Sequence, residues 1–419
     1  SKKLGATSWP NLPALQDLFL RVALAEALPP AFSSGRDAPN WPVARARFLM
    51  QNGALNEAQA LLEALPQTAA THIETAFDVS LILDDSARFC QSLAPEHLAS
   101  LIFEARFFCL VQAGEWDAAA LALAAMEALE LVTDETATLL WAYLDPDLAE
   151  KLVDAQPDPG EINPLIFAVL KDVGLPLNVE TLPIKFAAAD LDGANGWRAQ
   201  IDAAIRLAQR GTLSGNELVA IFTQGAPSAS GRIWDHVAAW QRFDSELARQ
   251  NPQATEAALT AAWDAAIELN LEVVFAGLYA KDLKALPLGD DTRRLSHEML
   301  LLTREFDEAV RTLDGQDASS QLLRAIADGQ PLLLAPKNER FAAANRAFAD
   351  GEAVSPTVQR LLDAGRIGEA LLKAIADIDA GWIGDPSQLT SGLATLRAIG
   401  LEREARQIAL QILLLEPRA

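Results

Sequence analysis

The sequence predicts an all-α protein, and three observations lead to this fold class. Half of its 419 residues are apolar, with Ala and Leu dominant, whereas Tyr occurs twice and segments with a strong β-strand pattern are few. In residues 44–66 one apolar helix stops at Gly53, the residue type that most easily takes the left-handed conformation of a helix end. A second helix follows at once, with apolar side chains at helical spacing on one face: Ala58, Leu61, Leu62 and Leu65.

The third observation is that this turn recurs, as a glycine followed five residues later by an alanine. It is found at Gly53 and Ala58, Gly114 and Ala119, Gly365 and Ala370, and Gly400 and Ala405, and it recurs without the glycine at Arg304 and Ala309. A small side chain at the second position would let the two helices of a hairpin approach closely. Repeated hairpins are typical of proteins whose core grows by stacking. We therefore predict one elongated, curved α-solenoid of helix-turn-helix units that resemble degenerate tetratricopeptide repeats.

Residues 1–145 are expected to form N-terminal helical repeats. Pro10 and Pro13 frame the start of a first helix, and Pro29 and Pro30 stop it. Residues 31–42 are rich in Pro, Ser and Gly and predict a loop in which Asn40-Trp41-Pro42 holds an aromatic ring over the end of the first repeat. Apolar periodicity places helices at about 12–28, 43–52, 55–65, 70–83, 85–93, 96–112 and 115–130.

Residues 146–225 are expected to form an irregular helical joint. Prolines are dense here, at positions 146, 157, 159, 164, 176 and 183. They interrupt short helices that the pattern places near 148–155, 163–173 and 179–188. A clean amphipathic helix returns at 194–210, Gly211 ends it, and Ser214 is positioned to cap the next helix at 215–222.

Residues 226–419 are expected to return to helical repeats. Helices are predicted at 231–249, 253–269, 271–283, 291–303 and 305–313, and four more within 357–415, with Gly365, Gly381 and Gly400 at helix ends. Residues 316–349 form an irregular zone between these groups. The last helix, at 402–415, has no further repeat to cover it, so we expect its polar side to cap the array: Glu402, Arg403, Arg406 and Gln411.

The charge of the chain argues against some classes of partner. Its 57 acidic and 34 basic residues give a formal net charge of -23 and a pI near 4.6. Such a field repels nucleic acids and anionic lipid surfaces, and it suits solubility and basic protein partners. No apolar run approaches the ~20 residues of a membrane span, so we expect a chain that is not embedded in a membrane.

The two cysteines, Cys90 and Cys109, leave two alternatives open. If Pro95 starts the second helix of this pair, Cys109 lies ~20 Å along it from the turn, too far from Cys90 for a disulfide. If the turn falls near Ala99 or Ser100, the two side chains lie opposite each other. Without a bond, both are expected to pack as small apolar groups.

The sequence offers no motif for a metal or a nucleotide. The histidines lie far apart, at His72, His97, His236 and His297, and the cysteines add no zinc-site spacing. His297-Glu298 starts like a zinc-protease motif, but Leu301 stands where the second histidine is needed. No phosphate loop or dinucleotide-binding glycine pattern is present. We expect no metal, no cofactor and no catalytic residue.

The alternative function is an enzyme or binder acting on glycans, because helical barrels of about this length include enzymes that use two carboxylates beside aromatic rings. The candidates are Glu115-Trp116-Asp117, Trp141 with Asp145 and Asp147, and Trp234-Asp235-His236 with Trp240. A structural role fits them better. Asp117 suits the first turn of a helix, and Trp240 lies at core spacing with Val237. Basic residues at 293, 294, 397, 403 and 406 are expected to balance nearby carboxylates.

Three stretches resemble an uncharacterised family of alphaproteobacterial Ala/Leu-rich exported proteins with helical repeats, some of which carry an antifreeze-glycopeptide label. They are residues 105–125, with Phe-Cys before Gly114; residues 203–222, AAIRLAQRGTLSGNELVAIF; and residues 361–414, with GRIGEA and LRAIGLE. The resemblance implies a periplasmic rather than a cytoplasmic setting, and it carries over no catalytic residues. The spacing of the two cysteines is slightly shorter here than in that family.

Together these features predict a non-enzymatic scaffold or adaptor for protein–protein interactions. Each repeat of a solenoid buries one side of its helices and presents the other in a row, which creates a concave face that can hold another protein. One such setting is an accessory of a periplasmic cell-envelope machine, such as the flagellar motor.

Overall fold

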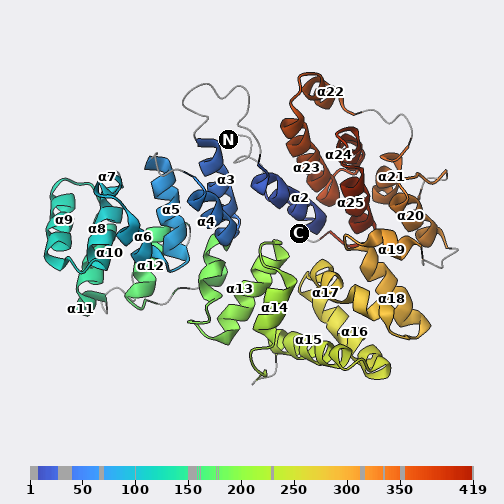
Figure 1. The fold of residues 1–419 in the computed structure, drawn as a ribbon, viewed down its shortest axis with the longest axis horizontal. Coiled ribbons are helices and arrows are strands. Elements are labelled where there is room, and N and C mark those ends of the chain that lie inside the picture. The colour runs from blue at the N-terminus through green and yellow to red at the C-terminus, as the bar shows by residue number, and fades with distance from the viewer. Residues whose placement is uncertain are drawn as a thin grey trace. The chain divides into compact units, whose positions relative to one another are not determined.

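The protein is all-α, as the sequence predicts (Figure 1). The computed structural model describes residues 8–26, 40–65, 70–99, 101–149, 158, 160, 162–175, 177, 179–227, 231–311, 317–333, 336–349 and 354–417, and these residues contain no strand. The chain forms two compact units. The first unit holds Ala23–Leu207, and the second holds the described residues up to Val22 together with those from Ala208 onward.

The first unit is built on helices that bury phenylalanine rings. Phe107, Phe108, Phe167 and Phe186 are fully buried, and the rings of Phe167 and Phe186 stack with centroids 4.6 Å apart. Its elements are α3 (Asn40–Gln51), α4 (Leu55–Glu63), α5 (Ala70–Ile82), α6 (Ser86–Ser92), α7 (Pro95–Leu98), α8 (Phe103–Gln112), α9 (Trp116–Ala128), α10 (Asp134–Leu144), α11 (Pro146–Ala149), α12 (Pro164–Asp172), η2 (Val179–Thr181), η3 (Ile184–Asp190) and most of α13 (Trp197–Gln209).

Several expectations for this unit are wrong. The helix expected at 96–112 is two helices, α7 and α8, because Leu101 is buried and Ile102 takes an extended conformation between them. The helix expected at 179–188 is two 3-10 segments, η2 and η3, which Pro183 separates. The sequence pattern does not predict α10, whose first turn is capped by the Thr133 side chain.

The expected loop at 31–42 is also partly wrong. Residues 40–42 open α3, because proline is tolerated in the first turn of a helix, where its missing N–H has no intrahelical partner. Residues 31–39 of that loop lie outside the described residues, as do positions 27–28, 150–155 and 312–313 of the expected helices.

The second unit combines most of α2 with the C-terminal helices. An aromatic cluster of Trp240, Phe243 and Phe275 is fully buried in its core, as the helical spacing around Trp240 predicts. The elements are α2 (Pro13–Leu24), α14 (Gly215–Phe222), α15 (Arg232–Ala248), α16 (Pro252–Glu268), α17 (Glu272–Ala285), α18 (Asp290–Leu301), α19 (Phe306–Val310), α20 (Ala318–Ala327), α21 (Glu339–Arg346), α22 (Pro356–Asp363), α23 (Ile367–Ile383), α24 (Ser387–Ala398) and α25 (Glu402–Leu414).

Helix α25 lies in the interior of the second unit, so the expectation that its polar side caps an exposed end is wrong. Gln411 is fully buried: its Oε1 accepts a hydrogen bond from the backbone N–H of Ala14 at 2.8 Å, and its Nε2 donates to the carbonyl of Leu302 at 2.9 Å. Arg406 donates to the carbonyl of Ala327 at 2.8 Å. Asp307 of α19 lies 2.6 Å from Arg403 and 3.8 Å from Arg406, so the arginines of α25 also pair with a neighbouring helix.

The N-terminal segment of this unit is bound to it by long-range contacts. The Asn11 backbone N–H donates to Asp379 at 2.7 Å, and Arg21 pairs with Glu404 at 3.1 Å. Arg304 pairs with Asp17, on the same turn of α2 as Arg21. Polar residues of the last helix therefore serve internal contacts, because α2 and α18–α20 cover the sides that an open array would leave exposed.

The glycine turns have the geometry that the sequence predicts. Gly53, Gly114, Gly365 and Gly400 all have positive φ, between 68° and 88°. At Gly400, the N–H bonds to the carbonyl of Arg397 and the next N–H bonds to that of Leu396, which is the hydrogen-bond pattern of a Schellman cap. Each following alanine is completely buried, as is the alanine after the turn without glycine: Ala58, Ala119, Ala370, Ala405 and Ala309.

Replacing Gly400 with Val is expected to lower the free energy of unfolding by about 1–2 kcal/mol, because a β-branched residue is strained at φ 88°. No heavy atom lies within 4 Å of the position that a Cβ would take, so the cost comes from the backbone alone. Gly368→Val is the matched control, since Gly368 lies in helix α23 with equally open space and no positive φ. Urea unfolding measures both variants, and equal midpoints would contradict the turn assignment.

Candidate interaction surface

The tryptophan and carboxylate candidates for glycan chemistry do not form a shared site. Trp141 donates its Nε1 proton to Glu127 at 2.8 Å, and His236 bonds to Glu268 at 2.8 Å. Trp240 is buried and donates to the Tyr279 hydroxyl at 2.9 Å, and that hydroxyl donates to Asp244 at 2.9 Å. Trp116, Asp145, Asp147 and Asp235 do not line any of the cavities described below.

The histidines do not come together with the cysteines in a metal site among the described residues either. Within the ranges that the structure describes, no group of three or more His, Cys, Asp or Glu side chains could hold a metal ion. His72 is buried in the first unit, where its Nε2 lies 3.0 Å from the carbonyl oxygen of Leu62. The arginines near the C-terminus pair with carboxylates, as expected: Arg397 with Glu402 at 2.8 Å, and Arg403 with Asp307 at 2.6 Å.

One cavity of about 440 Å³ in the first unit does gather titratable groups. Burial raises the pKa of Asp202 to about 6, helped by the neighbouring Glu180 carboxyl, whereas Arg198 acts in the opposite direction. Burial also raises the pKa of Asp190. Arg206 lines the same cavity, but it donates to the carbonyls of Val179 and Leu182, both at 2.8 Å, and so holds the η2 segment in place.

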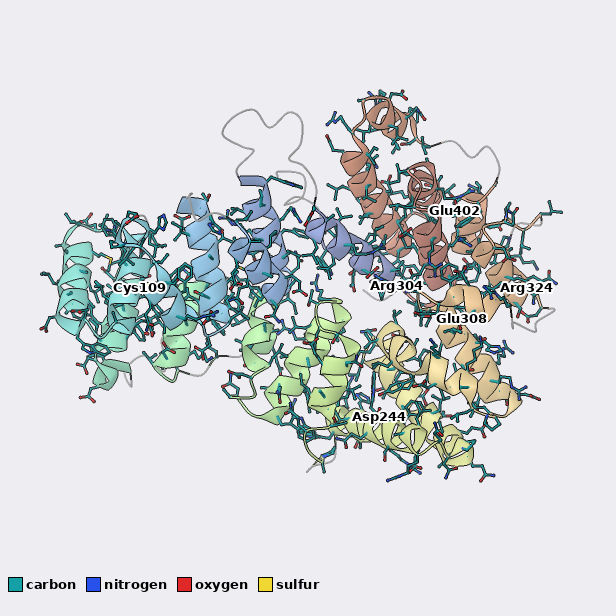
Figure 2. All side chains as sticks on the ribbon, viewed as in Figure 1. Cys109, Asp244, Arg304, Glu308, Arg324 and Glu402 are labelled. Atoms are coloured by element: carbon teal, nitrogen blue, oxygen red, sulfur yellow. A yellow bond between two sulfur atoms is a disulfide. The ribbon has the colours of Figure 1, made fainter. Side chains whose placement is uncertain are left out.

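A cavity of about 520 Å³ in the second unit is lined by Asp244 and Tyr279. Figure 2 labels Asp244. Burial, followed by the Asp244 charge, raises the pKa of the Tyr279 hydroxyl above its usual value. The hydroxyl therefore stays protonated and joins Trp240 to Asp244. This arrangement is a hydrogen-bonded support for the aromatic core.

Asp78 gives the first unit a pH dependence that can be tested. It borders a mostly apolar cavity of about 240 Å³, and burial raises its pKa to about 6 despite Lys185 and Arg47. A carboxyl with a raised folded-state pKa contributes stability below its unfolded pKa of about 4 and loses that contribution as the pH rises through about 6.

The unfolding free energy of Asp78→Asn is therefore expected to equal that of the native chain near pH 4. Above about pH 6 it should be higher than that of the native chain, by an amount on the order of 2 kcal/mol. Urea unfolding of both proteins across this range measures the difference. Asp264→Asn, at an exposed position of α16, controls for the loss of one charge. A difference between Asp78→Asn and the native chain that is the same at every pH would contradict the assignment.

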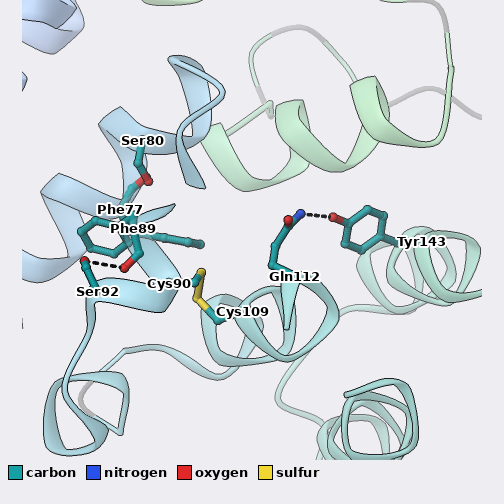
Figure 3. Close-up of a disulfide and its surroundings, with 8 residues drawn as sticks. All are labelled: Phe77, Ser80, Phe89, Cys90, Ser92, Cys109, Gln112 and Tyr143. Atoms are coloured by element: carbon teal, nitrogen blue, oxygen red, sulfur yellow. Dashed lines mark hydrogen bonds between the residues drawn. A yellow bond between two sulfur atoms is a disulfide. The ribbon is translucent and has the colours of Figure 1, made fainter. Parts of the chain in front are cut away.

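A disulfide between Cys90 and Cys109 joins α6 to α8, with the Cα atoms 5.4 Å apart (Figure 3). The bond corresponds to the alternative with a turn near residues 99–100, since α7 ends at Leu98 and α8 starts at Phe103. The ring of Phe77 lies 5.9 Å from both Phe89 and Phe108, so apolar packing surrounds the bridge. The bridge therefore holds α8, on which α9 packs, against the helices that precede it.

Exposed large apolar side chains concentrate on α9 and the segments next to it. Ten large apolar side chains are exposed among the described residues, and six of them fall within residues 102–131: Ile102, Phe103, Trp116, Leu121, Leu129 and Leu131. Leu121 is 73% exposed and Leu129 is 67% exposed. Surface clusters of this kind mark interaction sites more often than isolated exposed apolar residues do.

The exposed apolar residues of α9 form a stripe, which we call the α9 face: Ala118, Leu121, Ala125 and Leu129. Their spacing of three, four and four residues places them on one side of a helix. The opposite side of α9 is buried through Ala119, Leu123 and Met126. The helix is thus apolar on two sides, and none of the described residues of the first unit covers the α9 face.

The surroundings of the α9 face are acidic. Residues 107–150 contain no Lys, Arg or His, whereas six carboxylates lie on α9 and its flanks: Glu115, Asp117, Glu127, Glu130, Asp134 and Glu135. The ion pairs found among the described residues involve none of these six. The α9 face, with the carboxylates of Glu115, Asp117 and Glu130 near its two ends as an acidic border, is the candidate site of this chain.

The sequence predicts α9 as a helix, but its exposed face was not predicted. The available signal was that its residues are apolar all round, whereas a helix on the surface of a soluble protein usually has one polar side. Comparison of the chain with protein-family models, with curated proteins and with solved structures gives no match. None of the helices in the described ranges is both long and apolar enough to cross a membrane.

Proposed function

We propose that this chain is a non-enzymatic scaffold or adaptor that holds another protein, and that it works in the periplasm as an accessory of a cell-envelope machine, such as the flagellar motor. The observation that supports an interaction role is the exposed α9 face with its acidic border. The glycine-ended hairpins favour the solenoid architecture that scaffolds commonly use.

The periplasmic part of the proposal has separate support. Disulfides persist in oxidising compartments and are rare in the cytosol, so the Cys90–Cys109 bridge favours an exported protein. The resemblance to an exported Ala/Leu-rich family points the same way. Intact-mass measurement after thiol alkylation tests this part: protein recovered from its native compartment should carry no alkylated cysteine, and two alkylated cysteines would contradict export.

The interaction role is tested by photo-crosslinking in the native cell. A photoreactive amino acid at Leu121 should give a discrete adduct with a protein of the cell envelope, identified by mass spectrometry. The same amino acid at Ile367, which is comparably exposed on α23, should give no such adduct. Absence of a protein adduct at position 121 would overturn the assignment of the α9 face.

The rival function, glycan cleavage, draws its support from the cavity that holds Glu180 and Asp202. Two neighbouring carboxyls, one with a raised pKa, are the minimum that general acid–base chemistry requires. Phe167 is the one aromatic residue among those lining this cavity, so the aromatic walls of a sugar site are lacking there. Hydrolysis of a glycan by the native chain, lost in Asp202→Asn, would favour the enzyme over the scaffold.

A further inference from the structure

The shape of the α9 face fits another helix. Its four residues extend over about 16 Å, or three helical turns. Alanines alternate with leucines along it, so the leucines project while the alanines leave depressions between them. Small residues in such positions let a second helix approach to the 8–10 Å interaxial distance of packed helices. A partner helix with apolar residues at the same spacing would bury Leu121 and Leu129.

The charges around this face decide which kind of helix it binds. Glu115 and Asp117 lie at the start of α9, and Glu130 lies just beyond its end. A partner helix with Lys or Arg beside its apolar residues would neutralise these carboxylates, whereas an acidic helix would be repelled. A second copy of this chain is disfavoured for the same reason, since it would bring two acidic borders together in a chain whose net charge is -23.

Resting on the proposed scaffold function, we infer that the α9 face binds a basic amphipathic helix of another protein. The apolar stripe supplies the contact area and the acidic border selects the charge of the partner. Binding of this kind follows the helix-in-groove mode, in which apolar anchors at helical spacing carry the affinity.

Two synthetic peptides of about 18 residues test this inference with the full chain. Both carry the same Leu/Ala stripe, and the polar face holds Lys in one and Glu in the other. Fluorescence anisotropy of the labelled peptides should show binding of the basic peptide, weakening as salt is added, and no binding of the acidic one. The double substitution Leu121→Ser with Leu129→Ser should weaken the affinity for the basic peptide about tenfold. Ile367→Ser with Ile383→Ser, at exposed sites on α23, should not change its affinity.

The outcomes separate this inference from the proposed function. Equal binding of both peptides, or binding of the basic peptide that the two leucine substitutions leave unchanged, would overturn the inference. Self-association of the native chain that the same substitutions abolish, seen by analytical ultracentrifugation, would make a second copy the occupant and would also overturn it. In each of these cases, a protein adduct at position 121 in the crosslinking experiment would still support the proposed scaffold function.

Discussion

Reduction of the Cys90–Cys109 disulfide is expected to lower the unfolding free energy of the first unit by about 3 kcal/mol. The bridge closes a loop with a sequence separation of 19 residues, and opening it restores conformational freedom to the unfolded chain. The double variant Cys90→Ala with Cys109→Ala should show the same loss without a reductant. Denaturant titration with hydrogen-exchange readout measures the effect in peptides from α6 and α8.

Peptides from the second unit are the internal control for this experiment. Exchange in α16 should not change on reduction, because the bridge lies wholly within the first unit. Unaltered protection of α6 and α8 after complete reduction would show that the bridge contributes nothing to stability. Equal loss of protection in both units would show that they unfold as one.

Gly392→Ala is expected to destabilise the second unit by about 2 kcal/mol, although alanine is the better helix former. Gly392 lies on α24 where α23 packs against it. An added Cβ would clash with Cγ1 of Ile378 and would lie 2.8 Å from the backbone carbonyl oxygen of Ala374. The carbonyl cannot move without disturbing α23, so the two helices must separate.

Gly277→Ala is the matched control for this substitution. Gly277 lies within α17 of the same unit, and a Cβ there would meet no atom within 4 Å. The same Gly-to-Ala substitution should therefore stabilise the unit by about 0.5–1 kcal/mol, because alanine has the higher helix propensity. The midpoints of thermal or urea unfolding should shift in opposite directions in the two variants. A shift of both in the same direction would refute close packing as the cause.

Gly381 shows where sequence reasoning misassigned a residue at this contact. It was expected at a helix end, but it lies inside α23, where a Cβ would come within 2.7 Å of the backbone nitrogen of Leu389. Glycine ends a helix in some places and permits close helix packing in others, and a glycine by itself does not distinguish the two uses. Gly365 and Gly400 were predicted correctly because a buried alanine follows each at a fixed distance.

The remaining differences arise from contacts between residues far apart in the chain. Gln411 looks like a solvent-facing residue in its own helix, but its partners are Ala14 and Leu302. No proline or glycine marks the break between α7 and α8 in the sequence. The break follows instead from the burial of Leu101. At the α9 face the local apolar pattern can be read from the sequence. The sequence does not show whether another helix covers that pattern. The elongated shape of the predicted solenoid stays a prediction.

The residues that hold α2 have a consequence for the order of folding during synthesis. Asp379, Glu404 and Gln411 leave the ribosome 368 to 397 residues after the residues that they bind, and Ala23–Leu207 of the first unit is made in between. At about 5–20 residues per second, α2 waits roughly 20–80 seconds for these partners. The first unit can fold in that interval, whereas the second can close only after its final helix emerges. Until then Leu15 and Phe19, fully buried in the finished protein, lack these neighbours and offer an apolar target to chaperones.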